Sequence, residues 1–433
     1  MGSMSAAVDT PPRTTSNGGY RAAIAITVCL FFLWGMANNL NDILIAQFKK
    51  AFVLSDFGTS FIQQVFYLGY FLFAIPAALT MQAKGYKAAI VLGLLLYGAG
   101  ALLFYPAAAL SQYSLFLTAL FVIAAGLAFL ETSANPLMTE VGDPATAARR
   151  LNWAQAANPL GAISGILIGR NFILSGIQHD DATLAAMSMA DQLAYYRQEI
   201  QAVQAPYLVI GLVVLLFAAA AASVRFPEAA PAHRLAASGD RPSFTEIFSR
   251  PRLLFATLAQ FFYVGAQVGL WSFTIRYAEA NQPGIGERAA ADMLFISLIL
   301  FAVGRFLGTA MMARISPAFL LGAFAGLALA LALVAALVGG RTGLYALVAA
   351  SFFLSIQFPT IFALGVEGLG PLRRAGASLI IMAIIGGAAL TGAMGLLSDK
   401  AGITLAMLVP AFCFGVIGLF AMSCLRTRVE AIP

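Results

Sequence analysis

Long apolar runs, separated by short polar segments, fill most of the chain. The run from Ala88 to Phe104, AAIVLGLLLYGAGALLF, contains no charged residue and no alternation of polar and apolar positions. A helix needs about 20 apolar residues to cross a bilayer, whereas a membrane strand alternates over about 10 residues. The pattern therefore predicts membrane-spanning helices and not strands.

Twelve such runs are found, six in each half of the chain. The first six are predicted at 22–48, 57–82, 88–110, 114–138, 150–174 and 206–225. The second six are predicted at 253–279, 290–313, 317–339, 343–366, 375–398 and 403–424. The polar stretch 175–205 is expected to be a loop that contains an amphipathic helix.

This division predicts an all-α integral membrane protein made of two six-helix bundles. The bundles are expected at 22–225 and 253–425, joined by a cytoplasmic linker at 226–252 that contains Pro, Gly and Arg residues. Cytoplasmic tails are expected at 1–21 and 426–433.

Composition supports the membrane assignment. Apolar residues make up 61% of the chain and charged residues 10%, against about 45–50% and about 25% in a typical soluble domain. Too few polar side chains remain to cover a soluble globule, and disorder requires low hydrophobicity. The net charge of +6 is attributed to basic loops that set topology, so no nucleic-acid partner is expected.

The basic residues also predict an orientation. With a cytoplasmic N-terminus, 16 Lys and Arg residues fall on the cytoplasmic side and eight on the other, while Arg305 lies inside a span. Cytoplasmic loops are enriched in Lys and Arg. Both termini are therefore predicted to be cytoplasmic, although the pair Lys49 and Lys50 departs from the rule.

An internal repeat relates the two halves. The first span contains FFLWG and the seventh FFYVG. Pro136 precedes the basic residue Arg149 by 13 positions, and Pro359 precedes Arg373 by 14. Each Arg-Arg pair opens a span rich in Gly and Ala. Parallel copies of six helices are the arrangement of major-facilitator transporters.

Two acidic residues stand out within the predicted spans. Asp42 is late in the first span and Glu131 is deep in the fourth, and neither has a basic residue within one helical turn. A charged side chain at such a depth costs about 2.5–3.5 kcal/mol and marks a functional candidate. Glu140, Asp143 and Glu367 lie at span ends, where we expect solvated or loop-capping roles.

Amides recur at helical spacing around these acids. On the first span, Trp34, Asn38 and Asp42 share one face, with Asn39 beside it. On the fourth span, Glu131 and Asn135 share a face. On the fifth span, the residues at helical spacing are Asn152, Gln155 and Asn158. Amides donate to and accept from hydroxyl groups, and an aromatic ring packs against the C–H surface of a sugar. The pattern favours a sugar site. The alternative for any one amide is a contact between helices.

The acids also suggest an energy source. An apolar setting favours the neutral form of a carboxyl group, which could bind a proton outside and release it to a more alkaline cytoplasm. Sodium is the rival coupling ion because hard cations favour oxygen ligands. Arg305 could pair with a carboxylate or act as a structural tether.

Five segments resemble the L-fucose–proton symporter family of the major facilitator superfamily. They are FFLWGMANNLNDILIAQFKKAF, FLETSANP, RRLNWAQAANPLGA, FFYVGAQVGLWSFTIRYA and SIQFPTIFALGVEGLG, within a likeness that covers about 24–425. The resemblance implies sugar uptake with protons across a bacterial inner membrane by alternating access. It implies that Asp42 and Glu131 carry proton coupling, with Glu131 as the transfer site and Asp42 coupling protonation to sugar binding.

The same resemblance implies which residues line the cavity. Asn39, Gln155 and Asn158 fall on cavity amides and Trp34 on an aromatic beside them, while the second half offers Gln267, Trp271 and Gln357. The chain departs from the fucose symporters at Phe358, where they have Tyr, so one hydroxyl is missing. Glucose, galactose or N-acetylglucosamine are therefore alternative substrates.

Other functions fit the sequence less well. A drug or metabolite antiporter would favour a large apolar cavity over amide-rich faces. An enzyme is not expected, because the two histidines, His179 and His233, lie in predicted loops and cannot form a catalytic cluster inside the membrane. Direct ATP drive is not expected either, because no GxxxxGK[ST] loop is present. We expect no catalytic residue, no metal and no cofactor beyond the proton. The expected partners are a sugar, protons and membrane lipids, with the monomer as the functional unit.

Overall fold

The computed structural model describes residues 20–53, 56–173, 181–227, 244–282, 284–285 and 287–429. Within these ranges the chain is helical and contains no strand. A few side chains inside the helices, among them that of Asp42, are not described.

The first half begins with three long helices. They are α1 (Arg21–Ala51), α2 (Asp56–Ala109) and α3 (Tyr113–Glu140). Shorter elements follow as η2 (Pro144–Thr146), α4 (Ala147–Gln155), α5 (Ala157–Ile168), η3 (Gly169–Ile173), α6 (Asp181–Ala186), α7 (Met189–Gln201) and α8 (Gln204–Ser223). The predicted amphipathic segment is thus the pair α6 and α7, and 174–180 lies outside the described residues.

The second half has the same general plan. It begins with η4 (Phe244–Ser249), α10 (Pro251–Asn281), α11 (Glu287–Met311) and α12 (Pro317–Leu337). It continues with α13 (Gly340–Leu354), α14 (Gln357–Val366), η5 (Gly370–Leu372), α15 (Arg373–Met382), η6 (Ala383–Ile385), α16 (Gly386–Ala401), α17 (Ile403–Ala406) and α18 (Leu408–Val429).

These elements account for twelve membrane crossings. Ten helical stretches in the described ranges are long and apolar enough to cross a membrane. One of them, Phe61–Ala109, holds two crossings, because Gly85 breaks the helix with a φ of 82°. The consecutive helices α4 and α5 supply the remaining crossing. The prediction of an all-helical, multi-pass membrane protein is confirmed.

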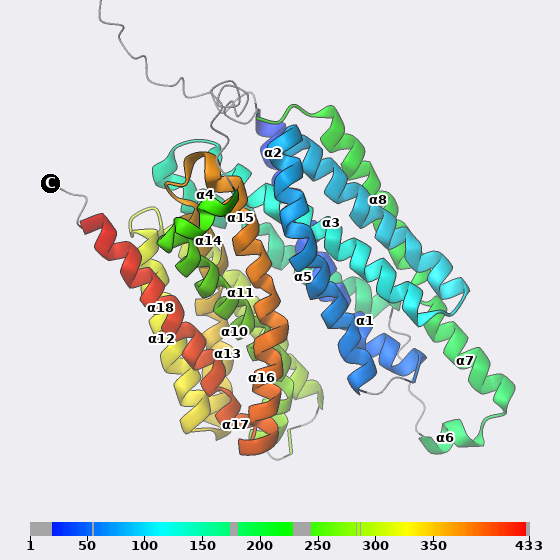
Figure 1. Ribbon diagram of the computed structural model, residues 1–433. Helices are drawn as coiled ribbons and strands as arrows, with labels where there is room; N and C mark the ends of the chain where they lie inside the picture. The colour runs from blue at the N-terminus through cyan, green and yellow to red at the C-terminus, as the bar shows by residue number, and fades with distance from the viewer. Residues whose placement is uncertain are drawn as a thin grey trace, which may run out of the picture.

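The helices form two groups that meet at one end (Figure 1). Helices α1 to α3 and α5 to α8 pack together on one side and α10 to α18 on the other, and α4 lies between them against α3 and α14. The groups contact each other mainly through α15 against α2 and α3, and α14 against α4. In Figure 1 they converge at the upper end, where α18 finishes, and separate toward the lower end. The predicted linker boundaries stay a prediction, because 228–243 lies outside the described residues.

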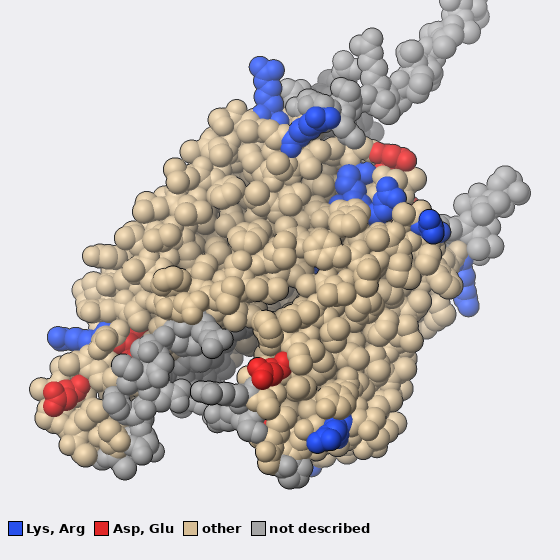
Figure 2. Space-filling view, turned by 180° about the vertical axis from the view of Figure 1, so that it is seen from behind, with Lys and Arg blue, Asp and Glu red and all other residues tan. Residues whose placement is uncertain are grey.

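Charged side chains mark the two ends of the molecule. Figure 2 shows Lys, Arg, Asp and Glu gathered toward the ends of this face, with a broad belt free of them between. The same view shows a hollow between two lobes at its lower edge. Such a belt fits the hydrocarbon layer of a bilayer.

Glycines bring the first helix of each half against a broken helix. A Cβ atom on Gly161 would lie 1.9 Å from the carbonyl oxygen of Phe32, and one on Gly165 would lie 2.7 Å from that of Met36. In the second half, a Cβ atom on Gly386 would lie 2.1 Å from the carbonyl oxygen of Phe261. Small residues allow such close backbone contact in membranes. The contacts repeat between the halves, as the sequence repeat predicts.

Replacing Gly161 with Ala should destabilise the first bundle. The added methyl group would collide with backbone atoms of α1, and we expect a loss of about 1–3 kcal/mol. The matched control is Gly392→Ala in α16, where a Cβ atom would meet nothing within 4 Å. Thermal unfolding in detergent, followed by size-exclusion chromatography of heated samples, measures both. Equal melting temperatures for the two variants would contradict the packing.

Candidate functional site

A buried hydrogen-bonded chain crosses between the two halves. The side-chain amide of Gln155 donates to Asn135 Oδ1 over 2.7 Å, which joins α4 to α3. Arg305 of α11 donates through its guanidinium to Gln155 Oε1 over 3.1 Å. Arg305 is only 2% exposed and lies over the Phe301 ring, 5.1 Å from its centroid. Two predicted site residues, Asn135 and Gln155, are therefore joined to a cation of the opposite half.

Arg305 acts as a tether and not as the partner of an acid. Among the described residues no carboxylate forms a salt bridge with it, and Gln155 is its hydrogen-bond acceptor. The Nε atom of Arg305 is buried and has no hydrogen-bond partner among the described residues. Of the two roles that the sequence left open, the structure supports the tether.

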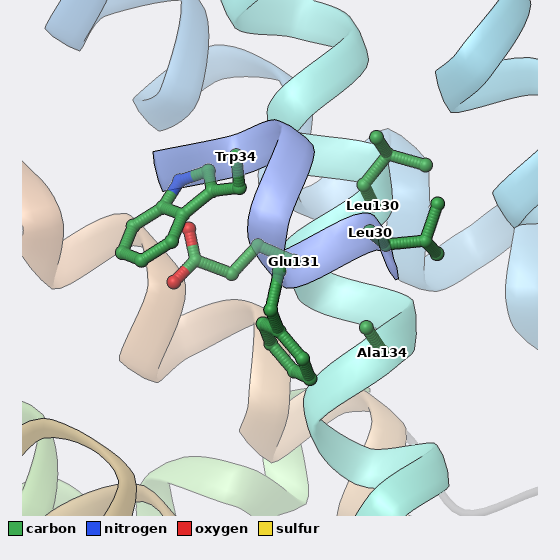
Figure 3. A pocket seen from close by; sticks show the side chains of 6 residues that line it. Leu30, Trp34, Leu130, Glu131 and Ala134 are labelled. Atoms are coloured by element: carbon green, nitrogen blue, oxygen red, sulfur yellow. The ribbon is translucent and has the colours of Figure 1, made fainter. Parts of the chain in front are cut away.

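Glu131 lies in a small apolar pocket beside Trp34. The side chain is 3% exposed, and neither carboxylate oxygen has a hydrogen-bond partner among the described residues. The pocket is lined by Leu30, Phe31, Trp34, Leu130, Glu131 and Ala134. Figure 3 shows the carboxyl group next to the indole of Trp34. About 10 Å³ is open to the centre of a water molecule, which is near the minimum for one water.

Tyr70 of α2 completes this corner of the site. The indole N–H of Trp34 donates to the hydroxyl of Tyr70, which is itself buried. An ionised carboxylate without donors or cations nearby is costly in an apolar setting. Binding a proton removes that cost.

A second set of predicted residues is partly exposed. Asn39 donates to the carbonyl of Gly35 over 3.0 Å and Asn158 to that of Phe31 over 3.4 Å. The side-chain oxygens of both amides accept no hydrogen bond from the described residues. These oxygens can accept from a hydroxyl group of a ligand. Trp34 and Asn38 on α1 are partly exposed as well.

The second half contributes two aromatic or amide residues to this partly exposed set. Trp271 of α10 donates to Ser351 Oγ over 3.1 Å, and its ring meets Phe301 edge-on at 5.1 Å. Gln267 lies one turn earlier on α10 and is partly exposed, without a hydrogen bond to the described residues. Both side chains are therefore partly accessible in this conformation.

Gln357 lies elsewhere, in the protein interior. It is fully buried at the start of α14, and its amide donates to the carbonyl of Phe353 over 2.9 Å. This bond holds the break between α13 and α14, so the residue is not on an open surface in this conformation. The neighbouring Phe358 is buried between Trp34 and Tyr263, with ring centroids 6.0 and 5.9 Å away.

Asp42 cannot be placed in the same way. It belongs to α1, two turns beyond Trp34, but its side chain lies outside the described residues. Its place in the site stays a prediction.

Three hydroxyl residues of this region were not predicted. Tyr70 accepts from Trp34, Ser351 accepts from Trp271, and Thr360 accepts from Asn152 over 3.1 Å. The last contact joins α4 to α14 across the halves. A single Ser, Thr or Tyr inside an apolar run cannot be recognised as a site residue from the sequence. Such residues are as common at positions where the hydroxyl bonds only to the backbone of its own helix.

Arginines close the end at which the two halves meet. Arg374 of α15 donates to the carbonyl of Met81 over 3.1 Å and lies 4.9 Å from the ring centroid of Tyr86. Arg373 pairs with Glu140 over 3.9 Å. These contacts join α15 to both α2 and α3, and fix the conformation in which this end is shut.

The three acids at span ends have different roles. Asp143 accepts from the backbone N–H of Ala145 over 3.0 Å, which confirms its predicted capping role. Glu140 forms the ion pair with Arg373, and Glu367 pairs with Arg252 at the start of α10. Both side chains remain accessible to solvent, at 27% for Glu140 and 43% for Glu367, so ion pairing is added to the expected solvated role.

The fold and this site define a membrane transporter of two parallel bundles, and comparison with known proteins agrees. Residues 23–384 match the Major Facilitator Superfamily. The chain belongs to this superfamily, whose members are transporters and not enzymes.

Within it, the chain belongs with the L-fucose–proton symporters and their glucose/galactose-transporting relatives. It is 45% identical over 93% of both chains to the L-fucose-proton symporter of Escherichia coli (strain K12). It is 34% identical to a glucose/galactose transporter of Brucella abortus biovar 1 (strain 9-941), covering 94% of this chain and 95% of that one. A crystal structure of the transporter FucP in the outward conformation matches with a TM-score of 0.85 at 44% identity, covering 94% of this chain and 99% of that one.

Replacing Gln155 with Glu should strengthen the tether to Arg305. The guanidinium now donates to a neutral amide oxygen, and the new carboxylate would compensate its buried charge directly. We expect a higher melting temperature than for wild type, despite the lost donor to Asn135. The control Gln155→Leu removes both bonds and should melt lower. A lower melting temperature for Gln155→Glu than for Gln155→Leu would contradict the tether.

Proposed function

We propose that the protein imports a monosaccharide, L-fucose or a related hexose, together with protons by alternating access. The observation that carries this proposal is Glu131, an acid with no hydrogen-bond partner among the described residues, in a small apolar pocket beside Trp34. The names of its relatives, L-fucose-proton symporter and glucose/galactose transporter, support the substrate class.

We infer that both termini are cytoplasmic and that the protein resides in a bacterial inner membrane. The excess of Lys and Arg in the segments predicted to be cytoplasmic supports this orientation. In this orientation the shut end, held by Arg373 and Arg374, faces the cytoplasm. The conformation described is then outward-facing, in keeping with its likeness to FucP in the outward conformation.

In the proposed cycle, protonation of Glu131 prepares the protein to close around a sugar. A proton from outside neutralises the carboxylate, so the occluded state encloses no uncompensated charge. The sugar hydroxyls bind the amide oxygens of Asn39 and Asn158, with the Trp34 ring against the C–H surface. Asp42 couples this binding to protonation.

Closing on the outer side must be accompanied by opening at the cytoplasmic end. The bonds from Arg305 to Gln155, from Asn152 to Thr360 and from Arg374 to Met81 all join the halves there or at mid-depth. They break as the inner end opens, and the proton then leaves to the more alkaline side. No cofactor beyond the proton takes part, and a single chain is sufficient.

Phe358 favours a second candidate within the same function. A Tyr in the fucose symporters would present a hydroxyl here, whereas Phe358 presents only its ring between Trp34 and Tyr263. A missing hydrogen-bonding group changes which sugar hydroxyls are recognised. Glucose or galactose is therefore the second candidate substrate, followed by N-acetylglucosamine.

Two other modes of transport receive less support. A sodium ion would require several oxygen ligands around it, whereas the pocket of Glu131 is lined otherwise by apolar side chains and an indole. A drug or metabolite antiporter would need a broad apolar cavity, whereas the exposed set contains three Asn residues and Gln267.

Glu131→Gln should abolish sugar accumulation driven by a pH gradient. The amide has nearly the same shape as the carboxyl group but cannot bind and release a proton. The pH gradient can therefore no longer drive accumulation of the sugar. Exchange of labelled for unlabelled sugar should survive, because the variant resembles the protonated state. Both are measured in proteoliposomes with a pH gradient, with Na⁺ replaced by choline in a parallel arm.

Wild-type uptake that persists in choline supports proton coupling, and uptake that requires Na⁺ contradicts it. Uphill accumulation by Glu131→Gln at the wild-type rate would likewise remove this residue from the coupling mechanism.

Phe358→Tyr should increase the affinity for L-fucose relative to glucose and galactose. A recovered hydrogen bond to a sugar hydroxyl is worth about 0.5–1.5 kcal/mol, or roughly two- to tenfold in affinity. Counterflow with labelled L-fucose, glucose, galactose and N-acetylglucosamine measures the preference of wild type and variant. If the variant's ranking of sugars equals that of wild type, this position does not select the substrate.

A further inference from the structure

A separate pocket opens on the surface between α3 and α4, at the shut end of the molecule. It has a volume of about 370 Å³ and is lined by seven residues, including Asp143, Arg149, Arg150 and Trp153. None of them belongs to the transport site described above. Two guanidinium groups and one carboxylate make the pocket positively charged overall.

The two arginines, Arg149 and Arg150, differ in the hydrogen bonds that they form. Arg150 donates to the backbone carbonyls of Met138, Thr139 and Asp143 over 2.7, 3.0 and 3.1 Å. It thereby holds the loop after α3, and the carboxylate of Asp143 lies near enough to offset its charge. Arg149 forms no hydrogen bond and no ion pair with any described residue.

The internal repeat explains why Arg149 is left unpaired. Its counterpart in the second half, Arg373, pairs across the halves with Glu140, at the end of α3. Glu367, the acid that follows α14, is paired with Arg252 at the start of α10 and not with Arg149. The positive charge of Arg149 remains in the pocket without compensation.

An exposed aromatic lies one helical turn below this charge. Trp153 follows Arg149 by four residues on α4, or about 6 Å along the axis. It is 46% exposed and lies 6.1 Å from the ring of Phe306 on α11, which is 38% exposed. Tryptophan is enriched at the boundary between headgroups and hydrocarbon, and basic pockets beside membrane helices bind lipid headgroups.

We propose that this pocket binds the headgroup phosphate of a membrane phospholipid, with Arg149 as its counter-charge. The acyl chains run down the face formed by Trp153 and Phe306. Because the pocket carries one positive charge in excess, an anionic headgroup such as phosphatidylglycerol binds better than zwitterionic phosphatidylcholine. Trp153 and Phe306 come from different halves, so the lipid covers the seam between the bundles in the conformation described.

Arg149→Gln tests the proposal in the purified, full-length protein. Native mass spectrometry with added phosphatidylglycerol or phosphatidylcholine measures the affinity for each lipid. We expect the variant to bind phosphatidylglycerol roughly fivefold more weakly than wild type, with little change for phosphatidylcholine. The control is Arg341→Gln, which removes an exposed arginine at the start of α13, at the other end of the bundle.

Two further measurements separate a lipid from a free anion. Trp153→Ala should weaken lipid binding while leaving any binding of inorganic phosphate unchanged. Competition with inorganic phosphate at millimolar concentration should leave the lipid bound. Equal phosphatidylglycerol affinity in Arg149→Gln and wild type would overturn the proposal, as would displacement of the lipid by inorganic phosphate. Melting temperatures near wild type in both variants show that they are folded.

Discussion

The burial of one guanidinium between two bundles is the constraint on which the centre of this structure depends. Lipid and apolar side chains offer no hydrogen-bond acceptor, so a charged group at this depth must obtain its acceptor from the protein. Arg305 obtains it from Gln155, which in turn holds Asn135. Satisfying this single side chain therefore requires α11 of one half to stay close to α3 and α4 of the other. The polar groups of the centre hold the halves together in one conformation.

The links between the halves are few and polar, which suits a protein that must break and remake them. A hydrogen bond contributes only about 0.5–1.5 kcal/mol net, so the bonds of Asn152, Gln155 and Arg374 can be exchanged for others at small cost. Packing within each half is of a different kind, because the glycine contacts of α1 with α5 leave no space for an added methyl group. The contrast between loose links and tight bundles is what rigid-body motion of two halves requires.

The sequence predicted the architecture well and the central contacts only in part. Apolar runs recovered all twelve crossings, because a bilayer imposes a minimum helix length that any sequence must show. Glu131 could be recognised because an acidic residue inside a membrane span is costly and is usually functional. The partner of Arg305 could not be predicted, because Gln155 is 150 positions away and an amide carries no charge to match. Tyr70 and Thr360 were missed because hydroxyls resemble their apolar neighbours in such runs. Gln357 bonds to the helix break in this conformation, and its place in the cavity stays a prediction.

The interruption between α4 and α5 has a mechanical consequence. At Ala156 the helical hydrogen bonding shifts, with its N–H donating to Trp153. Below this point α5 is fastened to α1 through Gly161 and Gly165, whereas α4 carries Asn152 and Gln155, which bind the opposite half. The break at Ala156 therefore separates a segment packed against α1 from a segment bonded to the opposite half. The bonds of α4 to the opposite half can be lost while the close backbone contacts of α5 with α1 are kept.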